Sequence, residues 1–244
     1  RTSNRGDARH SWAILALLVR FIREYWPQTR IVFRGDSHFS KPRLLAWCDR
    51  NQVDYIVGMA RNQRLEALAA PAMDKVRTYY EAHGHKLAST FRFRYKARSW
   101  HKPRWVVARL EYGPQGPNPR FVISSRYDDG FKLYYEQYCA RGDMENRIKD
   151  QQLDLFAGRT SSTHWWTNQW RLILSGFAYT LFERLRVHLK NTPFERMSAG
   201  TLRLKLIKVG AVIIRNTRRI RVLMSDSYPH KNDLSALVQR LVPQ

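Results

Sequence analysis

The feature of this sequence best suited to chemistry is an acidic residue set among basic and aromatic residues at helical spacing. Tyr138, Arg141 and Glu145 recur at intervals of three and four residues, and Lys149 extends the pattern. On a helix these positions share one broad face. Carboxylate oxygens are the ligands that hard divalent cations such as Mg²⁺ prefer, so Glu145 is a candidate metal ligand. The alternative is an ordinary ion pair between Glu145 and Arg141 or Lys149 along the helix.

A second acidic candidate, Asp36, comes directly after a short apolar run at 31–33 that is typical of a strand buried on both faces. A helix with Pro42 in its first turn is predicted from about 40 to 51, and then an apolar strand at 55–59. This spacing indicates a βαβ unit with parallel strands and therefore an α/β fold. Functional side chains in such sheets lie at the carboxyl ends of strands, where Asp36 stands. Its alternative role is that of a turn or cap residue.

The charge of the chain indicates a polyanionic partner. The 244 residues include 43 Lys and Arg against 20 Asp and Glu, a net charge of +23 spread along the whole length. Basic groups that neutralise phosphates release counterions, so nucleic acid is the first expectation and an anionic membrane the alternative. The longest apolar stretch, 172–182, is shorter than the ~20 residues that a bilayer requires. With only Cys48 and Cys139 as cysteines, we expect a reducing cytoplasm and no zinc site.

Between about 84 and 127 the periodicity changes from helical to that of strands. In 89–96 aromatic side chains alternate with Arg92, Arg94 and Lys96, which predicts a half-buried antiparallel strand with a basic outer face. Further strands are predicted at 105–110 and 121–124, so we interpret the region as a β-rich insertion. These three residues, with Arg98 and Lys102, are the predicted nucleic-acid contact group, and a merely solvated strand face is the alternative.

Helical spacing returns after the insertion, at 131–156 and again at 165–189. In the second of these helices Trp165 and Trp166 are expected as buried anchors, with stacking on nucleic-acid bases as the alternative. The tail alternates from 202 to 223, carries a cluster of arginines between 215 and 221, and ends in a short helix.

Three segments taken together resemble a known family. The spacing Tyr-x2-Arg-x3-Glu ending at Glu145 is similar to the Y-R-E-K signature around the last catalytic carboxylate of bacterial insertion-sequence DDE transposases. Arg34-Gly35-Asp36-Ser37 resembles the strand end that bears their second Asp. The segments 154–160 and 168–172 are similar to the region downstream of the glutamate in one branch of that superfamily. The likeness runs in order along nearly the whole chain.

The resemblance implies a ribonuclease-H-like core with a β-rich insertion between the second Asp and the Glu. The interval from Asp36 to Glu145 is 109 residues (145 − 36), which is too long for a bare connection and accommodates such an insertion. The expected division of the chain is 1–83, the first part of the core; 84–127, the insertion; 128–190, the core helices with Glu145; and 191–244, a basic C-terminal region.

The resemblance also implies cut-and-paste DNA transposition that depends on two Mg²⁺ or Mn²⁺ ions. Asp36 and Glu145 would be catalytic metal ligands, and Tyr138, Arg141 and Lys149 would contact DNA. The expected partners are double-stranded DNA, as transposon terminal inverted repeats and as target, and further copies of the chain in a homodimer or synaptic complex. The expected location is the bacterial cytoplasm, in association with the nucleoid.

Two departures from the family pattern bear on activity. Gln152 stands where the signature has Lys, and the family's first Asp lies on a strand that precedes the first helix of this chain. Asp7 is the only acidic residue before Glu24 and precedes a helix, so we expect the first Asp, and the N-terminal strands of the core, in a segment upstream. This chain alone would then bind DNA without cutting it. The alternatives are a non-catalytic nucleic-acid-binding protein and a ribonuclease-H-like metal nuclease that cuts without joining.

Overall fold

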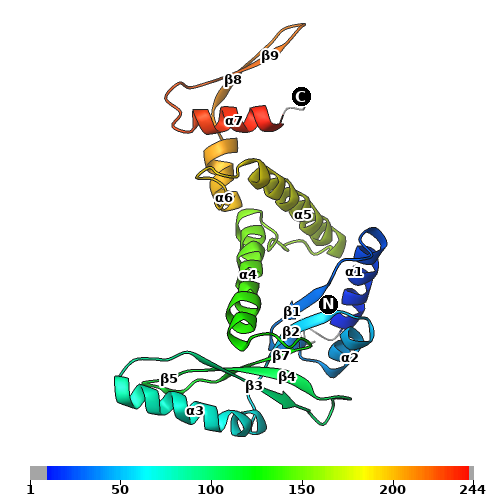
Figure 1. Cartoon of the computed structure of the whole chain (residues 1–244). Coiled ribbons are helices and arrows are strands. Elements are labelled where there is room, and N and C mark those ends of the chain that lie inside the picture. Colours follow the sequence, from blue (N-terminus) through cyan, green and yellow to red (C-terminus); the bar gives the residue numbers. More distant parts are fainter. Residues whose placement is uncertain (1–9, 242–244) are drawn as a thin grey trace. The chain divides into compact units, whose positions relative to one another are not determined.

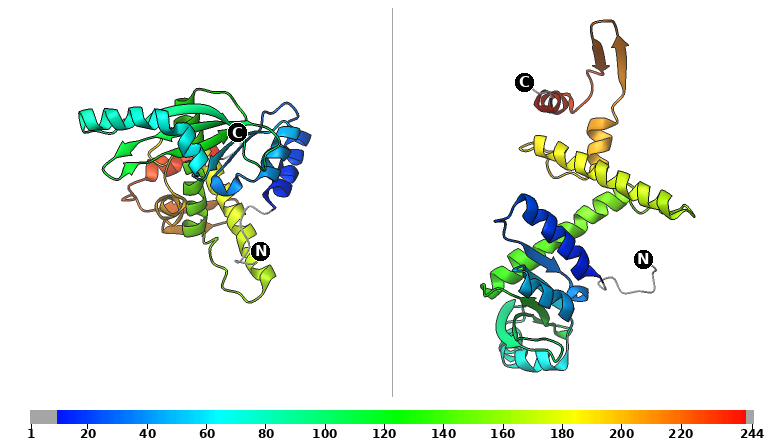
Figure 2. Two further views of the ribbon diagram at one scale, coloured as in Figure 1. Left: turned by 90° about the horizontal axis from the view of Figure 1, so that it is seen from below. Right: turned by 90° about the vertical axis from the view of Figure 1, so that its right-hand side faces the viewer.

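The chain forms two units in the computed structural model, which describes residues 10–241 apart from the side chain at position 141. The first unit is Arg1–Gly142 and the second is Asp143–Gln244. Figures 1 and 2 show the elements of each unit, coloured along the sequence. Among the described helices, none combines the length and the hydropathy that a membrane span requires.

The βαβ arrangement predicted from the sequence is present in the first unit. Its elements and the helix before it are α1 (Ser11–Tyr25), β1 (Val32–Gly35), the 3-10 turn η1 (Ser37–Phe39), α2 (Pro42–Arg50) and β2 (Asp54–Met59). β1 and β2 are parallel, with Gly35 opposite Val57. Pro42 lies in the first turn of α2, where its missing N–H removes no helical hydrogen bond. Arg23 of α1 donates to the Asn51 carbonyl at 2.7 Å and so ties α1 to the end of α2. The α/β class is therefore confirmed.

Three antiparallel strands extend this sheet beyond β2. The elements are α3 (Gln63–His83), β3 (Ser89–Tyr95), β4 (Arg104–Leu110), the short pair β5 (Tyr112–Gly113) and β6 (Gly116–Pro117), and β7 (Arg120–Ser124). The order across the sheet is β1-β2-β7-β4-β3, and every neighbouring pair other than β1 and β2 is antiparallel. The strands predicted at 89–96, 105–110 and 121–124 are thus confirmed, and they continue the same sheet as β1 and β2 (Figure 1).

Both faces of the sheet are covered by packed side chains. Because side chains alternate along each strand, neighbouring residues belong to the clusters on opposite faces. Val106 and Ala108 of β4 belong to a cluster that also contains buried residues of α1, α2 and α3. Val107, which lies between them in the chain, belongs to a cluster on the opposite face with Leu133 and Tyr134. These two residues come from η2 (Lys132–Tyr138), a π-helical segment. The segment that carries Tyr138 is therefore packed directly on the sheet.

A buried polar group joins three elements of the first unit. Arg104 at the start of β4 lies with its Nη2 2.6 Å from Asp49 Oδ2, and its Nε donates to the Tyr55 hydroxyl at 2.7 Å. The side chains of Arg104 and Asp49 are 1% and 7% exposed. Burial raises the pKa of Tyr55 well above its ordinary value, so this phenol stays protonated and donates to Asp49 Oδ1. The three side chains link α2, β2 and β4.

The second unit is built around one long helix and the tail after it. Beyond the 3-10 turn η3 (Cys139–Arg141) come α4 (Gly142–Lys149), the π-helical η4 (Asp150–Asp154), α5 (Trp165–His188), α6 (Ala199–Leu202), the π-helical η5 (Arg203–Ile207), β8 (Ala211–Arg215), β9 (Ile220–Met224) and α7 (Lys231–Leu241). Phe182 of α5 packs with Phe194, Leu202 and Leu237. The helical stretches predicted from about 131 and 165 are confirmed.

One expectation for the tail is wrong. The alternating pattern from 202 to 223 favoured strand throughout, yet 202–207 is helical and only the later part forms β8 and β9. Leu202 and Leu206, both buried, are four residues apart, a spacing that fits two strand repeats and one helical turn equally well. Because both fit this spacing, packing against Phe182 and Phe194 decides the local structure.

Removal of the Asp49 carboxylate is expected to destabilise the first unit strongly. In Asp49→Ala the Arg104 guanidinium stays buried without its counter-charge, which typically costs about 3–5 kcal/mol of unfolding free energy. Urea unfolding of the variant measures this loss. The control is Asp74→Ala on α3, whose partner is Arg77 and whose side chain is 62% exposed. This surface change is expected to cost less than about 1 kcal/mol. Equal losses in the two variants would contradict the role of the buried pair.

Candidate functional site

Asp36 lies where β1 ends, with its carboxylate half exposed. The side chain is 39% exposed, and Oδ1 accepts a hydrogen bond from the His38 N–H at 2.9 Å. Oδ1 also lies 3.3 Å from His38 Nδ1. Asp36 thus caps the turn η1, as its alternative role required. The cap engages Oδ1, so Oδ2 remains available as a ligand at the carboxyl end of a parallel strand.

The Tyr138 hydroxyl lies at the same end of the sheet, against β2. A Cβ atom added to Gly58 would lie 2.5 Å from Tyr138 Oη and 3.0 Å from the Ser37 backbone nitrogen. The hydroxyl and the backbone of Ser37 therefore both approach Gly58, in space that only a glycine leaves open. Within the first unit, the structure brings together the tyrosine and the aspartate that the sequence placed about a hundred residues apart.

Arg34 fastens this arrangement from the side of β1. Its Nη1 donates to the Gln137 carbonyl at 2.9 Å, one residue before Tyr138. The Tyr138 ring also packs in the cluster of Ile56, Val107 and Leu133. The position of Tyr138 is thus fixed by a polar contact to β1 and by apolar packing on the central strands.

The other residues of the predicted helical face lie in different parts of the structure. The side chain of Arg141 lies outside the part of the chain that the structure describes. Glu145 and Lys149 are exposed on α4, which belongs to the second unit. Since Asp36 belongs to the first unit, convergence of the Asp36 and Glu145 carboxylates stays a prediction.

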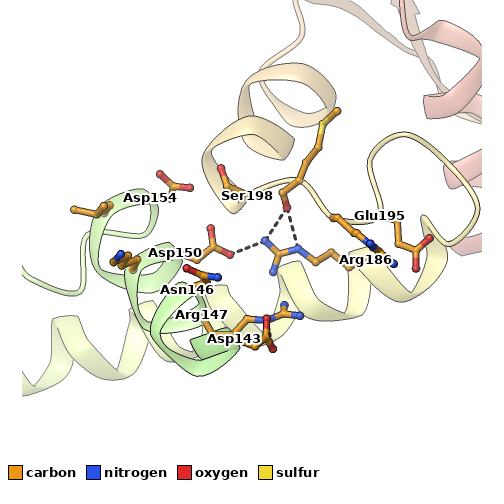
Figure 3. A pocket seen from close by; sticks show the side chains of 12 residues that line it. Asp143, Asn146, Arg147, Asp150, Asp154, Arg186, Glu195 and Ser198 are labelled. Carbon is orange, nitrogen blue, oxygen red and sulfur yellow. Dashed lines mark hydrogen bonds and ion pairs between the residues drawn. The ribbon is translucent and has the colours of Figure 1, made fainter. Parts of the chain in front are cut away.

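The face of α4 and η4 that carries Arg147, Asp150 and Asp154 is anchored within the second unit (Figure 3). These residues line a pocket of about 840 Å³ together with Arg186 of α5. At about 100° per residue, Glu145 lies roughly 200° around the helix from Arg147 and so faces away from this pocket.

Arg186 is the centre of this anchor. Its Nη2 lies 2.5 Å from Asp150 Oδ2, and its Nε and Nη2 both donate to the Met197 carbonyl. Its Nη1 contacts Glu183, which also accepts from Arg147 Nη1 at 2.8 Å. The Arg186 residue is 8% exposed, so these bonds are held away from water. Because every donor group of the guanidinium is engaged, the arrangement is suited to hold α4 and η4 rather than a ligand.

Asp150 and Asp154 complete the anchor by accepting hydrogen bonds from the first backbone N–H groups of α6. Asp150 Oδ1 accepts from the Ala199 N–H at 2.7 Å and Asp154 Oδ2 accepts from the Gly200 N–H at 2.8 Å. Burial by itself would raise the pKa of Asp154, but the bonds from Gly200 and Ser198 bring it below its ordinary value. Asp154 therefore stays ionised. A Cβ on Gly200 would lie 2.8 Å from the Asp154 carboxyl carbon, so this approach needs a glycine.

A metal centre is not formed by the described residues alone. Among residues 10–241, no three His, Cys, Asp or Glu side chains group closely enough to hold an ion. Asp36 fits the donor type of a divalent-cation site, but one carboxylate is not a complete ligand set. Asp7, the alternative first ligand, lies outside the described residues.

The predicted nucleic-acid contact group on β3 is partly engaged elsewhere. Arg92 donates to the Asp128 carbonyl and lies 4.1 Å from the centre of the Tyr127 ring. Arg94 donates to the Pro103 carbonyl at 3.3 Å. Lys96 is exposed and has no recorded partner among the described residues. Structural contacts therefore account for Arg92 and in part for Arg94, while Lys96 stays a candidate for phosphate contact.

The expectation of buried tryptophan anchors is wrong. Trp165 and Trp166 at the start of α5 are 62% and 78% exposed. The core of the second unit forms instead around Phe182 and Phe194, nearer the far end of that helix. The sequence did not reveal this, because aromatic residues at a helix start occur both in cores and on binding surfaces.

Several residues of the site were missed by the sequence analysis. The anchor could have been found, because Arg147, Asp150 and Asp154 recur at helical intervals and include opposite charges. Gly58 gave no signal in the sequence, since its role depends on Tyr138, which lies 80 residues (138 − 58) further along the chain. Gly200 gave no signal in the sequence, since its role depends on a carboxylate 46 residues away.

The first unit is thus an α/β structure in which a half-exposed carboxylate, Asp36, stands at the carboxyl end of a parallel strand. A sequence model of the family described as transposase DDE domain group 1 matches residues 1–244. The chain therefore belongs to this family of DDE transposases, and the resemblance seen in three segments is confirmed at that level. No curated protein matches the sequence.

A double-mutant cycle is expected to verify the placement of Tyr138. Gly58→Ala should lower the unfolding free energy by about 2 kcal/mol, because the new methyl group overlaps the hydroxyl. In a Tyr138→Phe background the same substitution should cost at least about 1 kcal/mol less, since the overlapping oxygen is gone. Urea unfolding of the four proteins gives the coupling. Equal costs in both backgrounds would mean that Tyr138 does not lie against β2.

Gly200→Ala is expected to loosen the helix that carries Glu145. The methyl group would displace the Asp154 carboxylate from the start of α6, at a cost of about 1–3 kcal/mol. Hydrogen exchange of peptides covering 143–154 should become faster. The matched control is Gly210→Ala, where nothing lies within 4 Å of the added atom. If Gly200→Ala and Gly210→Ala leave this exchange equally unchanged, the anchor is not formed as described.

Proposed function

We propose that this chain acts as a bacterial insertion-sequence transposase that binds transposon ends and takes part in cleavage and transfer of their strands. Its membership of the transposase DDE family supports the general function. The observation that carries the specific proposal is Asp36, half exposed at the carboxyl end of β1, with the Tyr138 hydroxyl against Gly58 of the neighbouring strand β2. We further propose that β1, α2 and β2 belong to a ribonuclease-H-like core, in which such a strand end bears a catalytic carboxylate.

Asp36 and Glu145 are the proposed ligands of two Mg²⁺ or Mn²⁺ ions. Such ions would activate a water molecule and stabilise the leaving oxygen of a phosphodiester. Asp36 would bind through Oδ2, because the cap of η1 engages Oδ1. Glu145 would bind from the face of α4 that points away from the Arg186 anchor. The proposal includes a further carboxylate from a strand upstream of α1.

The remaining residues of the predicted helical face would hold the DNA near the cut. The Tyr138 hydroxyl can donate to a phosphate oxygen, since its ring is fixed on the sheet. Arg141 and Lys149 would neutralise phosphate charge, with the guanidinium suited to paired hydrogen bonds. Arg34 would act through Tyr138, because it holds the Gln137 carbonyl.

The proposed partner is double-stranded DNA, both as terminal inverted repeats and as target. The net charge of +23 supports this, because each neutralised phosphate releases counterions. We also propose a homodimer or larger synaptic complex, since two transposon ends must be processed together. The proposed location is the bacterial cytoplasm at the nucleoid.

A second candidate function is DNA binding without catalysis. It is favoured by one observation, the lack of a group of three metal-ligating side chains within residues 10–241. In that case Asp36 would serve only as the cap of η1, and Glu145 only in a local ion pair. The two functions differ in what happens when these carboxylates are neutralised.

Neutralising either carboxylate is expected to abolish cleavage and spare binding. In the full-length protein, Asp36→Asn and Glu145→Gln should each reduce Mg²⁺-dependent nicking of terminal-repeat DNA by at least about 100-fold, more than the loss of an outer-shell partner. DNA affinity without metal should change less than about twofold, since the charge changes by one unit in 23.

The control for this experiment is Asp74→Asn on α3, an exposed carboxylate that pairs with Arg77 and has no role in the proposed site. Wild-type nicking that persists in Asp36→Asn and Glu145→Gln, or a wild type that binds but never cuts, would favour the non-catalytic protein. Joining of the cut strand to target DNA separates a transposase from a nuclease that only cuts.

A further inference from the structure

We propose that the hairpin of β8 and β9, Ala211–Met224, is an arm whose arginine-rich tip contacts the backbone of double-stranded DNA. This inference rests on the proposed function and adds to it a binding element separate from the residues around Asp36. The tip is defined as residues 215–221, which contain Arg215, Arg218, Arg219 and Arg221.

The hairpin is exposed along both strands. Every residue of β8 and β9 is exposed, and the two strands pair only with each other among the described residues. Figures 1 and 2 show it as a ribbon that extends from the part of the second unit formed by α6 and α7. A two-stranded ribbon by itself is only marginally stable in water, so a partner would stabilise it.

The turn of the ribbon is ordered by its own side chains. Asn216 Oδ1 accepts from the backbone N–H groups of Arg218 and Arg219, at 3.0 and 2.8 Å. The Asn216 N–H donates to the Arg219 carbonyl at 3.1 Å. These bonds fix the backbone that bears two adjacent arginines, which lowers the entropy that binding must remove.

The four tip arginines lack the counter-charge that Arg147 and Arg186 of the same unit have. Arg147 and Arg186 each contact a carboxylate. None of the four tip arginines has a recorded carboxylate partner among the described residues, and the sequence has no Asp or Glu from 196 to 225. A surface that concentrates unpaired guanidinium groups attracts phosphate, for which paired N–H donors are well matched.

The register directs the arginines to both faces of the ribbon. Arg215 pairs with Ile220 and Arg221 pairs with Ile214, so their side chains emerge on opposite faces. The major groove of B-DNA is about 12 Å wide and admits a two-stranded ribbon between two rows of phosphates. A ribbon with cations on both faces and at its turn can reach both rows.

The stem behind the tip is apolar on both faces, through residues such as Ile213 and Leu223, which are 69% and 50% exposed. A stem of this kind could also pack against a second copy of the chain. Duplex DNA is favoured as the occupant of the tip, because the charge there would repel the equally basic tip of another copy. Self-association through the stem is therefore the competing outcome of the test.

The salt dependence of DNA binding tests the arm. Binding of the full chain to a short duplex is measured without divalent metal between 50 and 200 mM salt for wild type and for Arg218→Ala/Arg219→Ala. If each arginine neutralises one phosphate, the log–log slope should fall by about 1.8, so the variant should lose about 12-fold less affinity than wild type over this range. At the low-salt end its binding should be clearly weaker.

The charge-matched control is Arg50→Ala/Lys75→Ala, which removes two exposed cations from α2 and α3 and should leave the slope unchanged. An equal slope for all three proteins overturns the proposal. A second outcome also overturns the proposal. In it, Val222→Asp/Leu223→Asp converts a dimer into a monomer in sedimentation, and the salt slope of DNA binding is the same in this variant, in wild type and in Arg218→Ala/Arg219→Ala. Failure of the catalytic proposal is recognised separately, because it would appear as unchanged nicking by Asp36→Asn with the arm's slope effect intact.

Discussion

The structure of the candidate site depends on one close approach, that of the Tyr138 hydroxyl to the backbone of β2 at Gly58. Any side chain at this position would occupy the place of the hydroxyl oxygen. Since the Ser37 backbone also lies close to this position, the missing side chain lets the segment that carries Tyr138 approach β2 next to the residues that follow β1. The Arg34 contact to Gln137 and the packing of Leu133 and Tyr134 on the sheet preserve that approach.

The two sides of α4 differ in their contacts. One face of the helix is occupied by charges that satisfy each other, with Arg186 and two aspartates binding the start of α6. Glu145 lies on the opposite side of the helix and is exposed. The charges that hold the helix are thus separated from the proposed metal ligand Glu145 by their position around the helix.

Much of the first unit could be predicted from local pattern. The parallel pair of β1 and β2, the strands at 89–95 and 120–124, and the position of Asp36 at a strand end all result from short apolar runs and alternation. The features that could not be predicted depend on distant partners. Gly200 matters because of Asp154, Arg92 is engaged by the Asp128 carbonyl, and Trp165 is exposed because the core of its unit forms elsewhere. Periodicity carries no information about such pairings, as 202–207 also illustrates.

The first helix has a consequence for the behaviour of the protein in solution. α1 turns Val19 inward, but Ile14, Leu17 and Phe21 are 60%, 62% and 57% exposed. Such a stripe of exposed apolar side chains promotes aggregation when molecules collide. The high positive charge opposes those collisions, and added electrolyte weakens that repulsion. The colloidal stability of this polypeptide therefore reflects a balance between apolar attraction through α1 and electrostatic repulsion between the positively charged molecules. This balance shifts with the ionic strength of the buffer.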